Sequence, residues 1–166
     1  TRNDAGIPAS VFPDLPVIRE PQINGFVSVT SNRREGFAWS KKLFVPPARE
    51  KLNIYELLVR DFDQAHSFDA VTARLDYLQQ LGVNAIELMP VNEFEGNDSW
   101  GYNPAIHQAL DKYYGTANAL KKLVDQCHLR GMAVILDVVF NHAFGQSPLA
   151  RMYWDAPNNR PSVNSP

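Results

Sequence analysis

The run from Ala133 to His142 constrains the fold of this chain more than any other stretch. Its first part is apolar except for Asp137, and Asn141 and His142 follow directly. A continuous apolar run is typical of a strand that is buried on both faces of a parallel sheet. Polar side chains at the carboxyl end of such a strand lie where α/β barrels place their active sites. Asp137, Asn141 and His142 are therefore candidate site residues, although a buried strand whose Asp is held by a structural Arg fits the run equally well.

Helical and strand patterns alternate from residue 52 onward. Short apolar runs bounded by turn signals predict strands at residues 53–59, 83–89 and 133–139. Ser67 and Thr116 are the predicted N-caps of two intervening helices, whose apolar residues recur at helical spacing as far as Gly82 and Gly131. Strands that alternate with helices indicate a parallel sheet with right-handed crossovers. The predicted fold class is therefore α/β.

Five segments resemble the α-amylase family of glycoside hydrolases, and they occur in the family's order. Asp-Val-Val-Phe-Asn-His at 137–142 is similar to its first signature region, and Trp-Gly-Tyr-Asn-Pro at 100–104 to the segment after its second barrel strand. Tyr-Tyr-Gly-Thr at 113–116 resembles the start of its second barrel helix. Residues 54–59 and 81–90 resemble its first and second barrel strands.

This resemblance implies the first β-α-β-α-β part of a TIM (β/α)8 barrel, preceded by a short β-rich or irregular segment. Residues 1–50 are expected to be the tail of an N-terminal β-rich domain plus a linker, with strands at 25–30 and 37–39. Residues 51–166 are expected to be the incomplete front portion of the catalytic domain. A complete eightfold barrel typically needs ~250 residues, and the chain has 166.

By resemblance, the chain is part of a retaining glycoside hydrolase that acts on α-glucans such as starch, glycogen and maltooligosaccharides. In this family a nucleophilic Asp follows strand four, an acid/base Glu follows strand five, and a third Asp follows strand seven. No catalytic residue is therefore expected here, and the isolated chain is expected to be inactive. Two alternatives stay open: a branching or transglycosylating enzyme of the same family, and a non-catalytic amylase-like protein that binds carbohydrate or serves a transporter.

The resemblance also implies roles for five residues. The matching Tyr and His of the family stack on and contact the sugar at the cleavage subsite, which makes Tyr102 and His142 the predicted substrate-binding residues. Trp100 is a third, which could equally form only the wall of the pocket. Asp137 is expected to support the site by holding an Arg that lies beyond this chain, and without it to be an unpaired buried charge. Asn141 is expected to cap the strand, with calcium ligation as the weaker alternative.

The connection between residues 91 and 114 is long for a βα loop, where about two to six residues are usual. Long polar and aromatic loops at this end of a barrel usually carry function. The acidic side chains that follow strands one and two are expected to be solvated, as is the helical His128. They are Asp61, Asp63, Glu93, Glu95 and Asp98. Trp154 could line a substrate groove, and residues 158–166 are expected to be irregular.

The net charge of −2 gives no reason to expect a nucleic acid or an anionic membrane as partner. The expected partners are the α-glucan and either the remainder of the barrel or a second copy, paired along the open edge at 133–139. The face toward the barrel interior is expected to carry Ile54, Ile86 and Val138. No cofactor is expected to be required, with Ca²⁺ an option in the full enzyme. The compartment stays open, with export slightly favoured over the cytoplasm.

Overall fold

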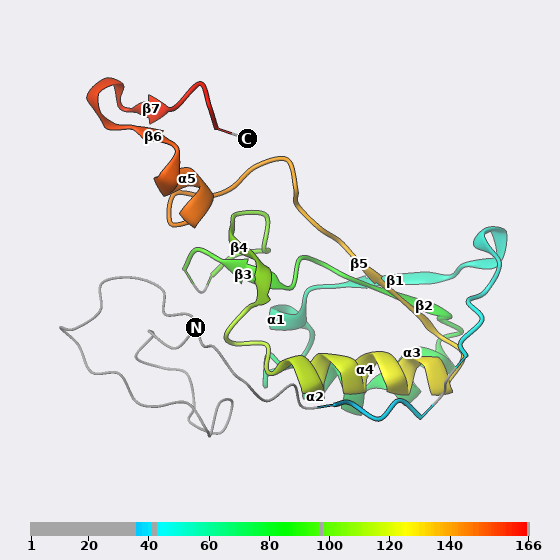
Figure 1. Cartoon of the computed structure of the whole chain (residues 1–166). Helices are drawn as coiled ribbons and strands as arrows, with labels where there is room; N and C mark the ends of the chain where they lie inside the picture. Colours follow the sequence, from blue (N-terminus) through cyan, green and yellow to red (C-terminus); the bar gives the residue numbers. More distant parts are fainter. Residues whose placement is uncertain (1–35, 41–42, 97, 166) are drawn as a thin grey trace.

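The computed structural model describes residues 36–40, 43–96 and 98–165, and its central element is a parallel three-stranded sheet. The strands are β1 (Ile54–Leu57), β2 (Ala85–Leu88) and β5 (Ala133–Leu136), in the order β1-β2-β5. Helices α2 (Phe68–Ala73), α3 (Leu75–Gln80) and α4 (Ala117–Leu129) lie on one side of this sheet (Figure 1). The predicted β-α-β-α-β order is confirmed.

The predicted helix caps are confirmed in atomic detail. The Ser67 hydroxyl accepts a hydrogen bond from the Ala70 amide at 3.2 Å, and the Thr116 hydroxyl accepts one from the Ala119 amide at 3.1 Å. Gly82 and Gly131 end their helices with φ values of 82° and 75°, which favour glycine. One prediction is wrong in detail, because the first helical stretch is interrupted at Arg74, whose ψ of 5° separates α2 from α3.

All three strands are four residues long, shorter than the predicted seven. Val59 already belongs to a single helical turn, α1 (Val59–Phe62). At the other edge the Asp137 amide still donates to the Leu88 carbonyl at 3.0 Å. The next donor along β2 would be the amide of Pro90, which has no N–H, so the ladder ends there. Asp137 and His142 consequently follow β5 instead of lying within it.

The strand register decides which side chains enter the core. Tyr55, Ile86 and Val134 are partners across the sheet, and all three pack in or against the cluster beneath the helices. Ile86 is fully buried, so its predicted position on the barrel-interior face is wrong. Ile54 and Val138 are 45% and 42% exposed. The opposite face carries Glu56 and Glu87, which are direct register partners.

The long connection between β2 and α4 is not irregular. It contains an antiparallel hairpin of β3 (Asn92–Phe94) and β4 (Pro104–Leu110), beyond the carboxyl end of the parallel sheet. Glu93, which was expected to be solvated, is fully buried and forms an ion pair with Lys112 at 2.7 Å. The ion pair thus joins β3 to the segment that follows β4.

The last part of the chain folds into short elements that lie beyond the hairpin (Figure 1). They are α5 (Pro148–Met152), β6 (Trp154–Asp155), the 3₁₀ turn η2 (Ala156–Asn158) and β7 (Arg160–Pro161). The two strands pair antiparallel, so the expectation of irregular structure over residues 158–166 is wrong at β7. Asn159 forms the turn between them with a φ of 48°, a left-handed conformation that Asn tolerates.

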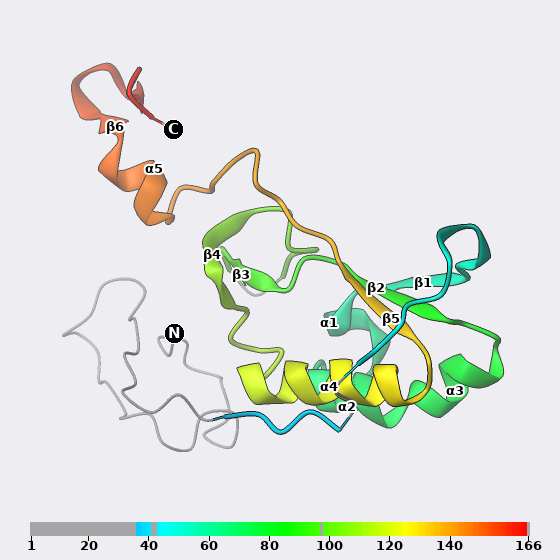
Figure 2. The same cartoon turned by 45° about the vertical axis from the view of Figure 1, so that its right-hand side comes forward.

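The segment before β1 runs beside α4 (Figure 2). Ser40 donates to Asp125 from its amide at 2.8 Å and from its hydroxyl at 2.7 Å. Phe44 stacks on His128 with ring centroids 3.9 Å apart, so His128 is half-buried and not an exposed position. A 3₁₀ turn, η1 (Arg49–Lys51), leads into β1.

The predicted strand at 37–39 is wrong, since these residues form no strand among the residues that the structure describes, and the one at 25–30 lies outside them. The division of the chain at residue 50 stays a prediction. Among the helices that the structure describes, none has the length and apolar character needed to cross a membrane.

Candidate functional site

The two motifs singled out in the sequence meet at the carboxyl end of the parallel sheet. His142 lies 2.7 Å from the Tyr102 carbonyl oxygen through its Nε2, although the two residues are 40 positions apart in the chain. The Tyr102 hydroxyl donates to Oδ2 of Asp137 at 2.5 Å. Tyr102, Asp137 and His142 therefore form one cluster, which we call the rim cluster.

Asp137 is neither unpaired nor fully buried, which corrects the expectation for this residue. It is half-buried, and the Tyr102 hydroxyl is its donor. That hydrogen bond raises the pKa of Tyr102 to about 12, with smaller contributions from burial and from the charges of Asp137, Glu56 and Glu87. The phenol consequently keeps its proton at any physiological pH, and its ring presents a neutral face to a ligand.

The hydrogen bond to the Tyr102 carbonyl also determines which ring nitrogen of His142 carries a proton. A carbonyl oxygen only accepts, so Nε2 must be the donor nitrogen. The sequence predicted that the imidazole offers one donor and one acceptor to a sugar. In the structure Nε2 is already occupied, which leaves Nδ1 of the exposed His142 as the atom that can bind a ligand hydroxyl.

Gly101 determines the backbone conformation of the turn that carries Tyr102. Its φ of 94° lies in the region that favours glycine, and a Cβ there would come within 2.6 Å of the Pro90 carbonyl oxygen. The turn therefore packs directly on the end of β2. Trp100 is 62% exposed on one side of this glycine, and Tyr102 is 39% exposed on the other.

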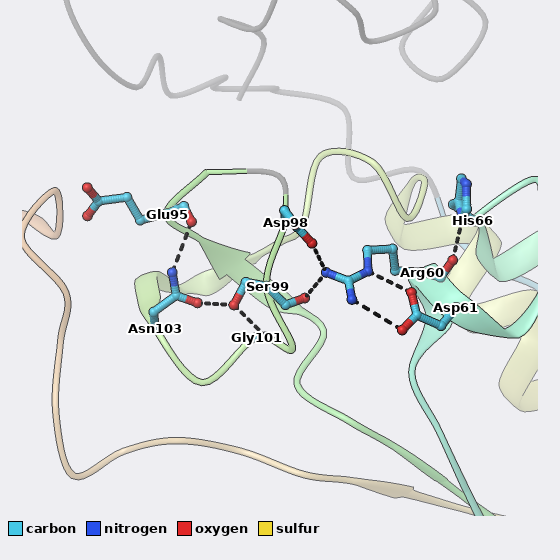
Figure 3. A network of polar contacts seen from close by, with 8 residues as sticks. All are labelled: Arg60, Asp61, His66, Glu95, Asp98, Ser99, Gly101 and Asn103. Atoms are coloured by element: carbon cyan, nitrogen blue, oxygen red, sulfur yellow. Dashed lines mark hydrogen bonds and ion pairs between the residues drawn. The ribbon is translucent and has the colours of Figure 1, made fainter.

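A polar network holds the hairpin loop in place (Figure 3). Arg60, in the helical turn α1 that follows β1, donates to Asp98 at 2.6 Å and to the Ser99 carbonyl at 3.1 Å. The Ser99 hydroxyl hydrogen-bonds Asn103 and accepts from the Gly101 amide at 2.9 Å, and Asn103 donates to the Glu95 carbonyl at 2.9 Å. Figure 3 shows Arg60 reaching from α1 to the loop that carries Asp98 and Ser99.

Several acidic residues expected to be solvated have partners in the structure. Arg60 binds Asp61 at 2.7 Å, and this contact holds the pKa of the Asp61 carboxyl below its usual range. Asp63 accepts from the Ala65 amide at 3.0 Å, and Oε2 of Glu95 accepts from the Gln146 amide at 3.1 Å. These carboxylates fix loops. Arg60 and Ala65 are neighbours of their partners in the chain, whereas Gln146 is 51 positions from Glu95, a contact that sequence spacing does not reveal.

A second group of charges lies buried beneath the hairpin. Glu93 and Lys112 are paired there, and Asp111 lies 3.9 Å from the Lys112 ammonium group. Burial raises the pKa of Asp111 to about 7, and the charge of Glu93 adds to the effect. Within the described residues, Oδ2 of Asp111 has no hydrogen-bond partner. Nothing in the sequence pattern distinguished these residues from solvated ones.

The residues after β5 line a pocket of about 590 Å³. Asn141 and His142 are on its wall, and Trp154 closes it from β6, as the sequence suggested for Trp154. His107 lies 3.2 Å from the His142 carbonyl through Nε2, and its ring stacks with Phe140 at a centroid distance of 6.3 Å.

Calcium ligation by Asn141 stays a prediction, because further ligands would come from parts of the enzyme outside this chain. The described part of the chain contains no group of three or more His, Cys, Asp or Glu side chains able to hold a metal ion. Asn141 is exposed on the pocket wall, and no step of the chemistry is assigned to a metal here.

A larger cavity of about 760 Å³ lies beside α1. It is lined by charged residues that already satisfy one another, with Arg60 bound to Asp61 and Arg74 bound to Asp63. A ligand would have to displace these pairs. The rim cluster and the pocket beside it are therefore the better candidate for substrate binding.

Comparison with known proteins agrees with this arrangement. The family described as "Alpha amylase, catalytic domain" matches residues 60–156. The malto-oligosyltrehalose trehalohydrolase of Saccharolobus solfataricus is 39% identical over 134 residues, which cover 80% of this chain and 23% of that protein. That of Arthrobacter ramosus is 47% identical over 89 residues, 54% of this chain and 16% of that protein.

A solved structure gives the same result. The crystal structure described as a putative alpha amylase from Salmonella typhimurium superposes with a TM-score of 0.67 at 34% identity, over 69% of this chain and 20% of that one. The chain thus spans about a quarter or less of the proteins that it matches. The matched region holds the hairpin, the parallel strands β2 and β5, and the rim cluster. The chain therefore belongs to the α-amylase family of glycoside hydrolases and forms part of its catalytic barrel.

Proposed function

We propose that this chain supplies part of the sugar pocket of a retaining glycoside hydrolase that acts on α-glucans such as starch, glycogen or maltooligosaccharides. The observation that carries the proposal is the rim cluster. Tyr102, Asp137 and His142 come from two separate loops, yet they are hydrogen-bonded to one another at the carboxyl end of the parallel sheet. This is the end at which β/α barrels bind their substrates.

The chemistry of the cluster suits a neutral sugar. The Tyr102 ring offers an apolar face to the C–H groups of a pyranose, while the His142 Nδ1 can bind a hydroxyl. The bond between Tyr102 and Asp137 holds the ring in one orientation, so less rotational freedom is lost when a sugar binds.

Bond cleavage in such an enzyme uses two carboxylates, one as nucleophile and one as acid and base. We assign neither role to a residue of this chain, whose part is to position the sugar. The cleavage groups are expected on later strands of the complete enzyme. The chain's short span relative to its relatives supports this division of roles.

Hydrolysis is favoured over glycosyl transfer by the relatives. The matched curated proteins named above are trehalohydrolases, and an Arabidopsis thaliana isoamylase is 30% identical over 142 residues, 66% of this chain and 18% of that protein. The name trehalohydrolase describes an enzyme that uses water as the acceptor. We expect loops outside this chain to decide between water and sugar as the acceptor, so hydrolysis stays part of the proposal.

The proposal is tested by assaying the full-length enzyme for release of reducing sugar from soluble starch and maltoheptaose, with cellulose as a β-linked control. Activity on the α-linked substrates alone is expected. The isolated 166-residue chain is the negative control and should release nothing. Starch binding without any product would instead support a non-catalytic carbohydrate-binding protein, and transfer products without hydrolysis would support a transglycosylase.

A further inference from the structure

Lys112 follows β4, and its side chain is only 4% exposed, an unusual position for a lysine. Both carboxylate oxygens of Glu93 accept hydrogen bonds from it. Oε1 accepts from the ammonium group at 2.7 Å, and Oε2 accepts from the backbone amide at 3.0 Å. Because Glu93 belongs to β3, these bonds hold the lysine side chain in one place against that strand.

The same ammonium group reaches the loop between β3 and β4. It donates to the Gly96 carbonyl at 3.2 Å, and it lies 5.8 and 5.6 Å from the ring centroids of Phe94 and Tyr113. An ammonium group has three N–H donors and is attracted to the faces of aromatic rings. Gly96 begins the loop that carries Tyr102, so Lys112 holds the start of this loop from inside the protein.

The strand pairing beside this loop is irregular. The register shifts between Asn92 and Glu93, and it shifts again between Glu93 and Phe94. Such shifts bend a strand and leave residues without a partner in the ladder. Backbone pairing in the hairpin therefore does not determine the position of the loop by itself, and the buried contact of Lys112 supplies a further attachment.

This attachment differs from the one at the surface. Arg60 also holds the loop, but through Asp98, whose side chain is 99% exposed, so water competes for that contact. The pair of Glu93 and Lys112 is shielded from water. A buried ion pair adds little net stability over neutral side chains of similar volume, because removing both charges from water offsets their attraction. Its effect here is to hold the hairpin and its loop in one arrangement.

We infer that Lys112 is a positioning residue of the sugar site, which holds the loop between β3 and β4 in the conformation that places the Tyr102 ring. This inference rests on the proposed function and adds to it a residue that acts on the sugar through Tyr102. Because its ammonium group is buried beneath the hairpin, Lys112 does not itself touch the substrate.

The test replaces both buried charges in the full-length enzyme. Glu93→Gln combined with Lys112→Met, which we call the neutral pair, leaves neither charge without its partner and removes the donor to the Gly96 carbonyl. We expect kcat/KM on maltoheptaose to fall about tenfold, the size typical for the loss of one hydrogen bond from a charged group. The unfolding temperature should stay close to that of the unmodified enzyme, because neutral side chains replace a paired charge.

A comparison in the Tyr102→Ala enzyme shows whether Lys112 acts through the ring. In that background the neutral pair should lower kcat/KM by less than about twofold, because the ring that Lys112 places is already absent. A general weakening of the fold would lower kcat/KM equally in both backgrounds. That result, or no loss in the Tyr102 enzyme, would overturn the proposal.

An exposed ion pair provides the matched control. Asp69 on α2 and Lys122 on α4 are 3.1 Å apart, with side chains that are 62% and 59% exposed. Asp69→Asn combined with Lys122→Met removes the same two kinds of charge away from the loop. This variant should keep kcat/KM within about twofold of the unmodified enzyme.

A second variant covers the case in which the neutral pair does not unfold cooperatively. Glu93→Asp keeps both charges but shortens the carboxylate arm by one methylene, which draws the ammonium group away from the Gly96 carbonyl. A loss of kcat/KM that disappears in the Tyr102→Ala background supports the positioning role. An equal loss in both backgrounds, no loss, or failure of this variant to fold as well overturns it.

Failure of the proposed function gives a different result. If the unmodified enzyme cleaves no α-glucan, hydrogen exchange of the backbone amides replaces the kinetic assay. Faster exchange over residues 98–103 in the neutral pair, with unchanged exchange over α4, then supports the positioning role without the activity. Unchanged exchange in the loop, or faster exchange in both segments, overturns it.

Discussion

The His142 Nε2 lies 2.7 Å from the backbone oxygen of Tyr102, so the side chain of one rim residue holds the main chain of the other. The contact joins the loop between β3 and β4 to the segment that follows β5. Because the acceptor is a backbone atom, the contact is independent of the side chain at position 102. The two predicted sugar-binding residues are thus coupled in position, and each can be altered separately.

We expect His142→Ala to lower kcat/KM of the full-length enzyme on starch. The lost transition-state stabilisation should be roughly 2–4 kcal/mol, the size typical for the loss of one preorganised polar group. The fold should tolerate the change because the side chain is exposed. Steady-state kinetics with circular dichroism measures both effects. The control is Tyr77→Ala, at a 52% exposed aromatic on α3. Unchanged kinetics in the His142 variant would remove it from the site.

Two substitutions at Tyr102 separate its ring from its hydroxyl. Tyr102→Phe removes the hydrogen bond to Asp137 and keeps the ring, and we expect a loss of about 1 kcal/mol in kcat/KM. Tyr102→Ala also removes the stacking surface and is expected to cost about 2–3 kcal/mol. Equal kinetics for the two variants would show that the ring does not bind the sugar.

Gly101 and Gly96 form a matched pair for testing the turn beneath the rim. Both have positive φ, 94° and 78°, so alanine introduces backbone strain of roughly 1–2 kcal/mol at either position. Only at Gly101 does the new Cβ also meet Pro90, at 2.6 Å from its carbonyl oxygen, while Gly96 faces open space. Gly101→Ala should therefore lower the unfolding temperature and the activity more than Gly96→Ala. Comparable effects of the two would contradict the close contact with β2.

The buried Asp111 predicts a pH dependence of stability. Its pKa is raised from 3.8 to about 7 in the fold, chiefly by burial. Between these values the folded chain holds a proton that the unfolded chain releases, so the free energy of unfolding falls as the pH rises through this window. Below pH 3.8 the carboxyl is protonated in both states, so its burial causes no loss of stability from ionisation. Above about pH 7 the loss of stability reaches its full size.

Asp111→Asn removes the ionisation but keeps an oxygen for the Tyr113 amide, which binds Oδ1 at 2.9 Å. The variant should gain stability relative to the unmodified enzyme between about pH 5 and about pH 8. Thermal unfolding at the two pH values measures the gain. Asp76→Asn, at a side chain that is 73% exposed, is the control. A stability difference that does not change with pH would mean that Asp111 is ionised throughout.

The sequence predicted the features that depend on residues close together in the chain, such as the helix N-caps. Ser67 and Thr116 were identifiable because an N-cap needs a side-chain oxygen immediately before a helical pattern. The buried pair of Glu93 and Lys112 was not, because the residues are 19 positions apart and burial depends on how the hairpin packs. Ile86 was placed on the wrong face because the apolar residues of its run, Val83, Ala85, Ile86 and Leu88, fall on both faces of the strand, which leaves the orientation of the strand undetermined.

For the candidate site, the sequence predicted which residues belong to it but not how they contact one another. The motifs located Tyr102 and His142, whereas the contact between them required the fold. The sequence motifs indicate no role for Arg60. Its role in holding the hairpin loop depends on Asp98, which is 38 residues away and on a different element. Phe140 and Trp154 gain their shared pocket only through the short elements after β5, which the sequence did not predict.

The final prediction concerns the open sheet. In the described part of the chain no strand pairs with the outer edge of β1 or β5, and the helices lie on one face only (Figures 1 and 2). Ile54, Leu136 and Val138 are each more than two-fifths exposed, with values of 45%, 48% and 42%. Burial of one such side chain contributes about 1.5–3 kcal/mol. The stabilisation lost by leaving several of them exposed is therefore large compared with a typical net stability of about 5–15 kcal/mol.

We therefore expect the isolated chain to self-associate along β5, because an unpaired apolar edge is a template for another strand. Leu136→Lys places a charge on that edge and should shift the protein toward monomer in sedimentation velocity. Leu129→Lys adds the same charge at a residue of nearly equal exposure, 49% against 48%, but on α4. It should leave association unchanged, since the helix face offers no backbone pairing. A monodisperse monomer with cooperative unfolding before any substitution would show instead that β5 is protected in solution.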